Sequence, residues 1–408
     1  MKLRLARWGV ALVALAIVAG CGDDGSAVDS DAPASTSATA AAPVGAVNVV
    51  GPPATPTPVG PSLGHPLAGI DRDAGISVKL SDGSVMWLFG DTAIKEPNGR
   101  LRFFVIGTAA WAPADEPTVT RDFVDALGRP TVFAAPTAEF PACPPGTPIA
   151  GMWPASAVAH RVGDRDRIVV WLENICLGDG ARGAGVGMSV AEVWYDPAHP
   201  PDGEPVTAKI LNSHLFPRRG FGLAATLGDN HDAYVYACDA DMSAKFPTEY
   251  GPCHAAVVDL DHVADPTKYR VWSGGDSWTP TTQAGAAQLA MPSSDPVKQY
   301  PIGSVSVSRD PAADRYVMVY SPWPGTSNEL AVRFATRPEG PWTDPSIVRL
   351  DGCHDTVAGV SYFCYAASAQ PSFSEPGRLG IGYYDRSIAA FPVRGSYMVT
   401  TVPITSTP

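Results

Sequence analysis

Two aspartates near the start of the folded part of the chain could carry out acid–base chemistry. Asp73 lies in the stretch Asp71-Arg-Asp-Ala-Gly-Ile-Ser, and Asp91 ends the apolar run Trp87-Leu-Phe-Gly-Asp. Two carboxylates can act as a proton donor and a proton acceptor when their environments separate their pKa values. The elements that carry Asp73 and Asp91 must therefore bring the two side chains to one place.

The segment between these aspartates predicts a β-hairpin, because alternating apolar residues flank a Gly-containing turn at 81–84. A three-residue loop at 81–83, with Gly83 in the left-handed conformation, places Asp73 directly opposite Asp91 with Cβ atoms roughly 5 Å apart. A two-residue loop at 82–83 shifts the pairing by one and sends the carboxylates to opposite faces. We expect the three-residue loop.

Five segments of the chain share one strand plan, in which a polar turn leads into a strand rich in aromatic and β-branched residues. These second strands run over 85–91, 168–173, 234–239, 316–321 and 379–385. Few charges, many Gly and Pro, and little helical periodicity favour an all-β fold. Repeated antiparallel units of this kind predict a five-bladed β-propeller. Two β-sandwich domains are the competing interpretation, but five copies divide poorly between two sandwiches.

In a propeller blade the first strand starts, and the second strand ends, on the same face of the disc. Five acids at such positions would gather around one mouth: Asp73, Asp91, Glu173, Asp239 and Asp385. Taken singly, each of them is explained by turn formation at a strand end. The Asp73/Asp91 pair differs because small neighbours, such as Gly75 and Gly90, would leave room for a ligand. We predict that Asp73 and Asp91 are catalytic, with Glu173 in reserve, and that Asp71, Asp239 and Asp385 bind substrate.

The N-terminal residues predict an export signal and a tether. Residues 1–21 combine early Lys and Arg with a short apolar run, and their end, Val-Ala-Gly-Cys, resembles the lipobox of bacterial lipoproteins. This resemblance implies a lipid anchor at Cys21 and a place in the bacterial cell envelope, outside the cytoplasm. An ordinary secretory signal or an unprocessed anchor are the alternatives. Residues 22–63 have the composition of a disordered tether, which leaves 64–408 for the propeller.

The net charge narrows the choice of partners, and the cysteine content predicts disulfides. A formal net charge of −12 argues against nucleic acid or anionic lipid as the main partner, so we expect a neutral ligand. We also expect a monomer. In an oxidising compartment the cysteines other than Cys21 predict disulfides. Short loops suggest Cys238–Cys253 and Cys353–Cys364, and elimination leaves Cys143–Cys176.

No metal or cofactor is expected from the sequence. The chain has no C-x-x-C pair that would suggest zinc. His231 and Asp232 could bind a metal but are better explained as a solvated turn, and His160 as a hydrogen-bonded core residue.

Several motifs together resemble a known family. Asp73-Ala-Gly-Ile-Ser, Trp87-Leu-Phe-Gly-Asp-Thr, Arg337-Pro-Glu-Gly-Pro-Trp and Gly377-Arg-Leu-Gly-Ile-Gly-Tyr-Tyr-Asp are similar to motifs of five-bladed propeller glycosidases that act on furanosides. They most resemble those of the bacterial propeller family that includes endo-D-arabinanases. The likeness implies catalytic carboxylates in the first blade, at Asp73 and Asp91. Relatives often carry His-Pro where this chain has Gln370-Pro371, and we expect Gln370 to contact substrate.

The expected function is hydrolysis of a furanose polymer, with arabinan as the substrate that the resemblance suggests. Glycosidases use one carboxylic acid to protonate the leaving oxygen and one carboxylate to attack or to activate water. The alternative is a non-catalytic surface propeller that binds a glycan or a protein through the same mouth.

Overall fold

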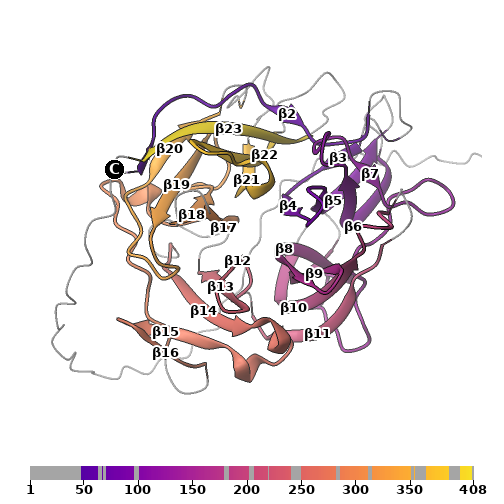
Figure 1. Ribbon diagram of the computed structural model, residues 1–408. Helices are drawn as coiled ribbons and strands as arrows, with labels where there is room; N and C mark the ends of the chain where they lie inside the picture. Colours follow the sequence, from indigo (N-terminus) through magenta and orange to yellow (C-terminus); the bar gives the residue numbers. More distant parts are fainter. Residues whose placement is uncertain are drawn as a thin grey trace, which may run out of the picture.

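Five antiparallel sheets stand around a common axis in the computed structural model (Figure 1). The structure describes residues 47–62, 67, 70–95, 101–178, 183–201, 206–218, 220–239, 250–281, 285–310, 315–350, 353, 364–385 and 396–406. These residues contain strands and short 3-10 turns, and no α-helix. The prediction of an all-β, five-bladed propeller is confirmed.

The first two blades contain the longest strands. The first blade is built from β3 (Ile70–Arg72), β4 (Gly75–Lys79), β5 (Val85–Lys95), β6 (Leu101–Ala112) and β7 (Arg121–Asp122). The second blade is built from β8 (Ile149–Val162), β9 (Arg165–Leu177), β10 (Gly183–Tyr195) and β11 (Lys209–Phe216). In both blades β5 and β9 continue past the predicted ends at Asp91 and Glu173. The two acids therefore lie within a sheet and not in a turn.

The third and fourth blades follow the same plan with shorter strands. The third contains β12 (Ala224–Leu227), β13 (Asp232–Cys238), β14 (Cys253–Asp259), β15 (Arg270–Gly274) and β16 (Ser277–Pro280). The fourth contains β17 (Val305–Asp310), β18 (Arg315–Tyr320), β19 (Glu329–Ala335) and β20 (Ser346–Arg349). Short 3-10 turns cover Leu260–His262, Pro266–Lys268, Pro296–Lys298 and Pro371–Phe373.

The fifth blade joins the two ends of the chain. It contains β21 (Cys364–Ala369), β22 (Arg378–Asp385) and β23 (Ser396–Ser406), and its outer strand is the N-terminal β1 (Val47–Val49). A second N-terminal strand, β2 (Thr57–Pro58), also pairs with β23, and the two lie side by side in Figure 1. The predicted tether over 22–63 is thus wrong for its last third, which belongs to the propeller. Residues 1–46, including Cys21, lie outside the described part.

The inner strands close the ring. Around the axis, β4 contacts β8, β8 contacts β12, β12 contacts β17, β17 contacts β21, and β21 contacts β4. Large aromatic side chains fill the spaces between blades. Trp171 of the second blade donates its Nε1–H to the hydroxyl of Tyr269, next to the third blade, over a distance of 3.1 Å. Trp87 of the first blade packs edge-on against Tyr397 of the fifth blade. Burial of such rings supplies much of the stability of a propeller.

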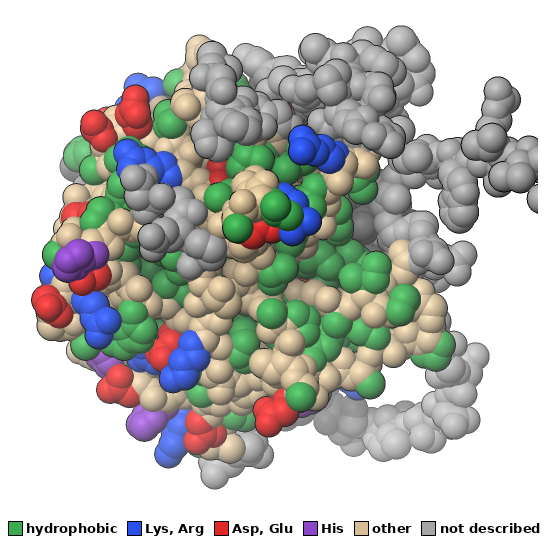
Figure 2. Space-filling view, turned by 90° about the vertical axis from the view of Figure 1, so that its right-hand side faces the viewer, with side chains coloured by type: hydrophobic (Ala, Val, Ile, Leu, Met, Phe, Trp, Pro, Cys, Tyr) green, Lys and Arg blue, Asp and Glu red, His purple; other side chains and the backbone are tan. Residues whose placement is uncertain are grey.

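Three disulfides have the predicted partners. Cys143 is bonded to Cys176, Cys238 to Cys253, and Cys353 to Cys364. Among the described residues no helix is long and apolar enough to span a membrane. The face shown in Figure 2 is uneven in charge: acidic, basic and histidine side chains gather toward one edge, and much of the rest is hydrophobic or uncharged.

Candidate active site

The hairpin of the first blade has the predicted register. The pairing of Lys79 with Val85 and of Gly75 with Phe89 requires the three-residue loop, and Gly83 has a φ of 86°. Extended to the start of β4, this register places Asp73 opposite Asp91, and the Asp73 N–H donates to the Asp91 carbonyl over 3.0 Å. Asp73 is therefore paired with Asp91 across the hairpin, although the φ of 42° at Ala74 interrupts the strand next to it.

The Asp73 carboxylate is held on both of its oxygens. Its Oδ1 accepts a hydrogen bond from the Asp91 backbone N–H over 2.6 Å, and its Oδ2 accepts one from the Tyr365 hydroxyl over 2.9 Å. Gly90 makes this geometry possible, because a Cβ at that position would lie 2.5 Å from Asp73 Oδ1. Small residues here make room for protein groups and not for a ligand, contrary to our expectation. A Cβ on Gly75 would similarly lie 2.4 Å from the Tyr397 ring.

The Asp91 carboxylate receives a donor from the second blade. Trp153, in β8, donates its indole N–H to Asp91 Oδ1 over 2.7 Å. Tyr365, which holds Asp73, comes from β21 of the fifth blade. The pair therefore lies where three blades meet, and both carboxylates remain partly exposed.

The two aspartates differ in how readily they lose a proton. Burial raises the pKa of Asp73 to about 6, and the hydrogen bonds from Tyr365 and the Asp91 N–H limit that rise. The pKa of Asp91 is raised well above its ordinary value, first by burial and then by the charge of Asp73, against the hydrogen bond from Trp153. This arrangement favours the proton on Asp91 and the negative charge on Asp73.

Asp71 influences the aspartate pair through its negative charge. Its side chain is buried and accepts a hydrogen bond from the Tyr384 hydroxyl over 2.9 Å. The negative charge of Asp71 raises the pKa of both Asp73 and Asp91. The next residue, Arg72, is buried in an ion pair with Asp122. The burial of Asp71 therefore argues against the prediction that it contacts substrate directly.

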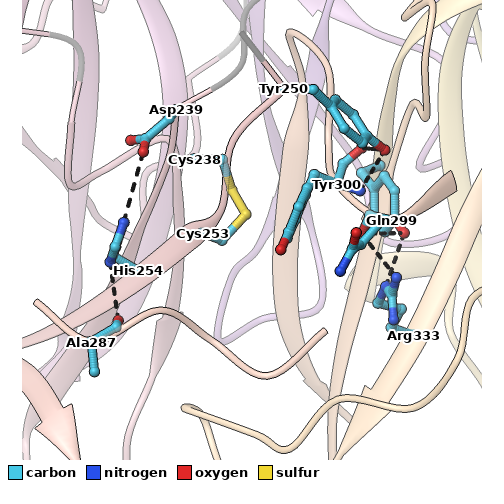
Figure 3. Close-up of a disulfide and its surroundings, with 10 residues drawn as sticks. Cys238, Asp239, Tyr250, Cys253, His254, Ala287, Gln299, Tyr300 and Arg333 are labelled. Carbon is cyan, nitrogen blue, oxygen red and sulfur yellow. Dashed lines mark hydrogen bonds and ion pairs between the residues drawn. A yellow bond between two sulfur atoms is a disulfide. The ribbon is translucent and has the colours of Figure 1, made fainter. Parts of the chain in front are cut away.

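Glu173 and Asp239 are the two other predicted acids that the solvent reaches. Glu173 lies directly opposite Trp153 in the β8–β9 register, so its side chain is on the same face as that indole. Asp239 follows β13, and 60% of its side chain is exposed. Its Oδ2 lies 3.8 Å from Nε2 of His254, whose Nδ1 contacts the Ala287 carbonyl (Figure 3). Both acids are thus at least partly accessible to solvent.

Asp385 and Gln370 are buried, which corrects the prediction that they bind substrate. Asp385 ends β22 opposite Cys364 and is 3% exposed. Gln370 is 0% exposed. Its Oε1 accepts from the Ser77 N–H, and its Nε2 contacts the Gly75 carbonyl and the Tyr397 hydroxyl. Gln370 therefore fastens the fifth blade to the first, behind the aspartate pair.

Tyr365 is the residue that the sequence analysis missed. The sequence around Trp153 predicts a loop, where the indole could stack on a sugar ring or pack between blades, but a register shift between Pro154 and Ser156 accommodates the proline within β8. Tyr365 precedes a register shift in β21, where Ala366 has a φ of 54°. Bulges of this kind redirect side chains next to active sites, and no periodicity in the sequence announces them.

Two groups of side chains have the spacing of metal ligands. Cys353, Cys364 and Asp385 form one of them, but both sulfurs are joined in a disulfide and are not available as thiolates. The other contains His231, Asp259 and Asp261, at the edge of the third blade away from the aspartate pair.

Comparisons with known proteins agree with this architecture. Residues 197–381 match a family model described as a domain of unknown function, DUF4185. The match covers less than half of the 408-residue chain and does not include Asp73 or Asp91. No curated protein matches the chain.

Solved structures resemble the whole propeller. A candidate hydrolase from Bacteroides ovatus superposes with a TM-score of 0.53 at 15% identity, over 81% of this chain and 85% of its own. A GH43_1 enzyme from Xanthomonas citri, complexed with xylose, gives a TM-score of 0.46 at 10% identity, over 85% and 89%. An exo-1,5-alpha-L-arabinanase from a bovine ruminal metagenomic library gives 0.40 at 11% identity, over 81% and 92%. At these sequence identities the similarity concerns the fold alone, and only the first of these three superpositions is used to support it.

Proposed function

We propose that the protein hydrolyses glycosidic bonds in a furanose polymer, with Asp91 as the general acid and Asp73 as the carboxylate that attacks the sugar. The observation that carries the proposal is the contrast within the pair. Asp73 is surrounded by two donors that favour its charged form, whereas Asp91 has one donor and faces the charge of Asp73. Hydrolysis of a glycoside needs this division between an ionised and a protonated carboxyl group.

The register favours retention of configuration at the anomeric carbon. Aspartates paired directly across the hairpin would bring their carboxyl groups near the ~5 Å separation of a retaining double displacement, rather than the ~6.5–9.5 Å that admits a water. Asp73 would form an ester with the anomeric carbon while Asp91 gives its proton to the leaving oxygen. Asp91 would then take a proton from water as that water displaces Asp73. The enzyme returns to its starting protonation state.

The substrate class rests on the resemblance and on the charge of the protein. Arabinan is the first polymer to test because the motifs around Asp73 and Asp91 resemble those of the arabinanase propellers. A formal net charge of −12 disfavours a polyanionic substrate. Glu173 and Asp239 are proposed to contact sugar hydroxyls at the mouth. A lipid anchor at Cys21 would hold this activity at the cell envelope.

Incubation of the full chain carrying Cys21→Ala with D-arabinan and with L-arabinan tests the reaction. Release of oligosaccharides that the Asp91→Asn variant does not produce supports hydrolysis, and NMR of the first product gives the stereochemistry. As a surface control, Asp125→Asn changes an exposed carboxylate that is paired with Arg129 and should leave the release unchanged.

A binding protein is the second candidate, and one observation favours it: both Asp73 oxygens already accept hydrogen bonds from the protein. Retarded migration in glycan affinity electrophoresis without product release from either arabinan would select binding. If product is released with inverted configuration, the protein is a hydrolase, but Asp73 does not attack the sugar directly.

A further inference from the structure

A second cluster of polar side chains lies between the second and third blades, far from the aspartate pair. It contains His160 near the end of β8, His231 in the turn before β13, Asp259 at the end of β14, and Asp261 in the 3-10 turn that follows β14. Trp153 and His160 are both in β8, and the residues between them separate the two regions by about 23 Å along the strand. The cluster is thus independent of the proposed hydrolysis.

Three members of the cluster have the spacing of metal ligands. The ligand atoms of His231, Asp259 and Asp261 all lie within 4.8 Å of one another. His231 Nε2 is 3.4 Å from Asp261 Oδ1, which is long for a hydrogen bond. Two ligands at about 2.0–2.1 Å from a tetrahedral ion would stand roughly 3.4 Å apart. That distance suits a shared ion better than a direct contact.

His160 adds a second imidazole that the protein leaves unsatisfied. Both of its ring nitrogens are buried and have no hydrogen-bond partner, so the expectation of a hydrogen-bonded core histidine is wrong. Its ring meets the His231 ring edge-on, with centroids 4.9 Å apart. An unpaired buried polar group is destabilising and calls for an explanation such as an ion.

The surroundings supply a further carboxylate and one cation. Asp232 pairs with Asp259 across β13 and β14, which brings a third carboxylate to the same end of the sheet. Arg167 is the opposing cation, with NH1 3.7 Å from Asp261 Oδ1, but its closer contacts are Glu192 Oε2 and the Leu260 carbonyl, each at 2.9 Å. His231 has a φ of 60°, a conformation uncommon outside glycine.

We propose that His231, Asp259 and Asp261 bind one divalent transition-metal ion, such as Zn²⁺, and that His160 completes the site by turning its ring toward them. Two imidazoles and two carboxylates form a ligand set that suits zinc. Such an ion would join the second blade to the third on the side away from the mouth. Its role there is structural, because the cluster is remote from the carboxylates that would act on substrate.

Titration calorimetry of the full chain carrying Cys21→Ala, with ZnCl₂ as the probe, tests this site. The six remaining cysteines are paired in disulfides, so the Cys21 change leaves no free thiol to compete for zinc. We expect one saturable site, and we expect His231→Ala to weaken it at least about tenfold. Asp261→Asn, at an exposed side chain that is safe for folding, should weaken it as well.

His199→Ala is the matched control. His199 pairs with Asp196 over 3.0 Å on the surface, but it belongs to no group of three ligands among the described residues. Its loss should leave the affinity for zinc unchanged. Cobalt(II) should give the visible absorption of a tetrahedral site in the unmodified cluster and lose it in His231→Ala. Absence of saturable binding, or equal affinity in His231→Ala and His199→Ala, would overturn the proposal.

Discussion

The first and third blades carry an aspartate at matching points of the same strand plan, yet the two side chains have different surroundings. Asp91 is held by Trp153 of the next blade and faces Asp73. Asp239 is 60% exposed, and its neighbour His254 is 3.8 Å away and comes from the same sheet. An acid near the end of a second strand is held by side chains of adjacent blades where those blades enclose it, and it stays exposed to solvent where they do not.

The means of stabilisation also differ between the two blades. The first blade is fastened to its neighbours by side chains such as Gln370 and Tyr365. In the third blade, a disulfide between Cys238 and Cys253 joins the two strands directly beside Asp239 and His254 (Figure 3). A disulfide fixes the backbone without desolvating the carboxylate. Strand position alone therefore does not determine how far an acid is enclosed by the protein.

The largest effect is expected on catalysis. Asp91→Asn should lower kcat for arabinan about 10²–10⁴-fold, because it removes the proton donor. Asp239→Asn should raise KM a few-fold at unchanged kcat, as expected for an exposed group that contacts sugar equally in ground and transition states. Steady-state kinetics of the two variants measures the contrast. Equal losses of kcat would show that the two blades do not differ as proposed.

Removal of disulfides should separate stability from activity. Cys238→Ala/Cys253→Ala opens a loop with a sequence separation of 15, and the expected loss is about 3 kcal/mol of unfolding free energy. The kcat should be retained, because the aspartate pair does not depend on this link. Urea unfolding and kinetics on the same sample report both quantities.

The comparison for that prediction is the disulfide of the second blade. Cys143→Ala/Cys176→Ala opens a separation of 33 and should cost about 4 kcal/mol. It should also lower kcat, because Cys176 lies in β9 a few residues after Glu173, and Glu173 pairs with Trp153. Loss of activity from the third-blade variant alone would reverse the assignment of the site.

The sequence was sufficient for features governed by local chemistry. The turn at 81–83 fixed the register of the hairpin, because the glycine and the loop length admit few geometries. The five second strands and the disulfide partners were also predictable, since alternation and short loops are local signals. Each of these features depends on residues near one another in the chain.

Features that depend on contacts between blades were not predictable. Val47–Val49 joins β23 at the far end of the chain, and nothing in its Ala- and Pro-rich surroundings indicates a strand. The burial of Gln370 and Asp385 and the approach of Trp153 and Tyr365 follow from how neighbouring sheets pack. Strand periodicity shows which residues share a face, but not what the next blade places against that face.

A smaller effect is expected on the pH profile. Activity should rise as Asp73 ionises, with its pKa at about 6, and fall at higher pH as Asp91 loses its proton. Tyr365→Phe removes a donor that favours ionised Asp73, so the pKa of Asp73 rises and the acidic limb moves to higher pH. A hydrogen bond worth about 1 kcal/mol corresponds to roughly 0.7 pH units.

Tyr195→Phe is the control for that shift. Tyr195 donates to Asp82 over 2.5 Å at the turn end of the same hairpin, so its loss affects a tyrosine–carboxylate contact remote from the pair. The acidic limb should stay in place in Tyr195→Phe even if the protein is less stable. A limb that moves equally in both variants would assign the shift to general loosening of the hairpin.

The smallest effect should come from the pair in the third blade. His254 and Asp239 stand 3.8 Å apart with the carboxylate largely in solvent, and exposed ion pairs typically contribute only about 0.2–1 kcal/mol. The His254 ring is already held by the Ala287 carbonyl over 3.0 Å, so loss of Asp239 leaves its position unchanged. A double-mutant cycle of Asp239→Asn and His254→Gln, followed by urea unfolding, should give a coupling below about 0.5 kcal/mol. A coupling well above that value would mean that solvent does not screen the pair, and the third blade would then hold a second enclosed carboxylate like that of the first.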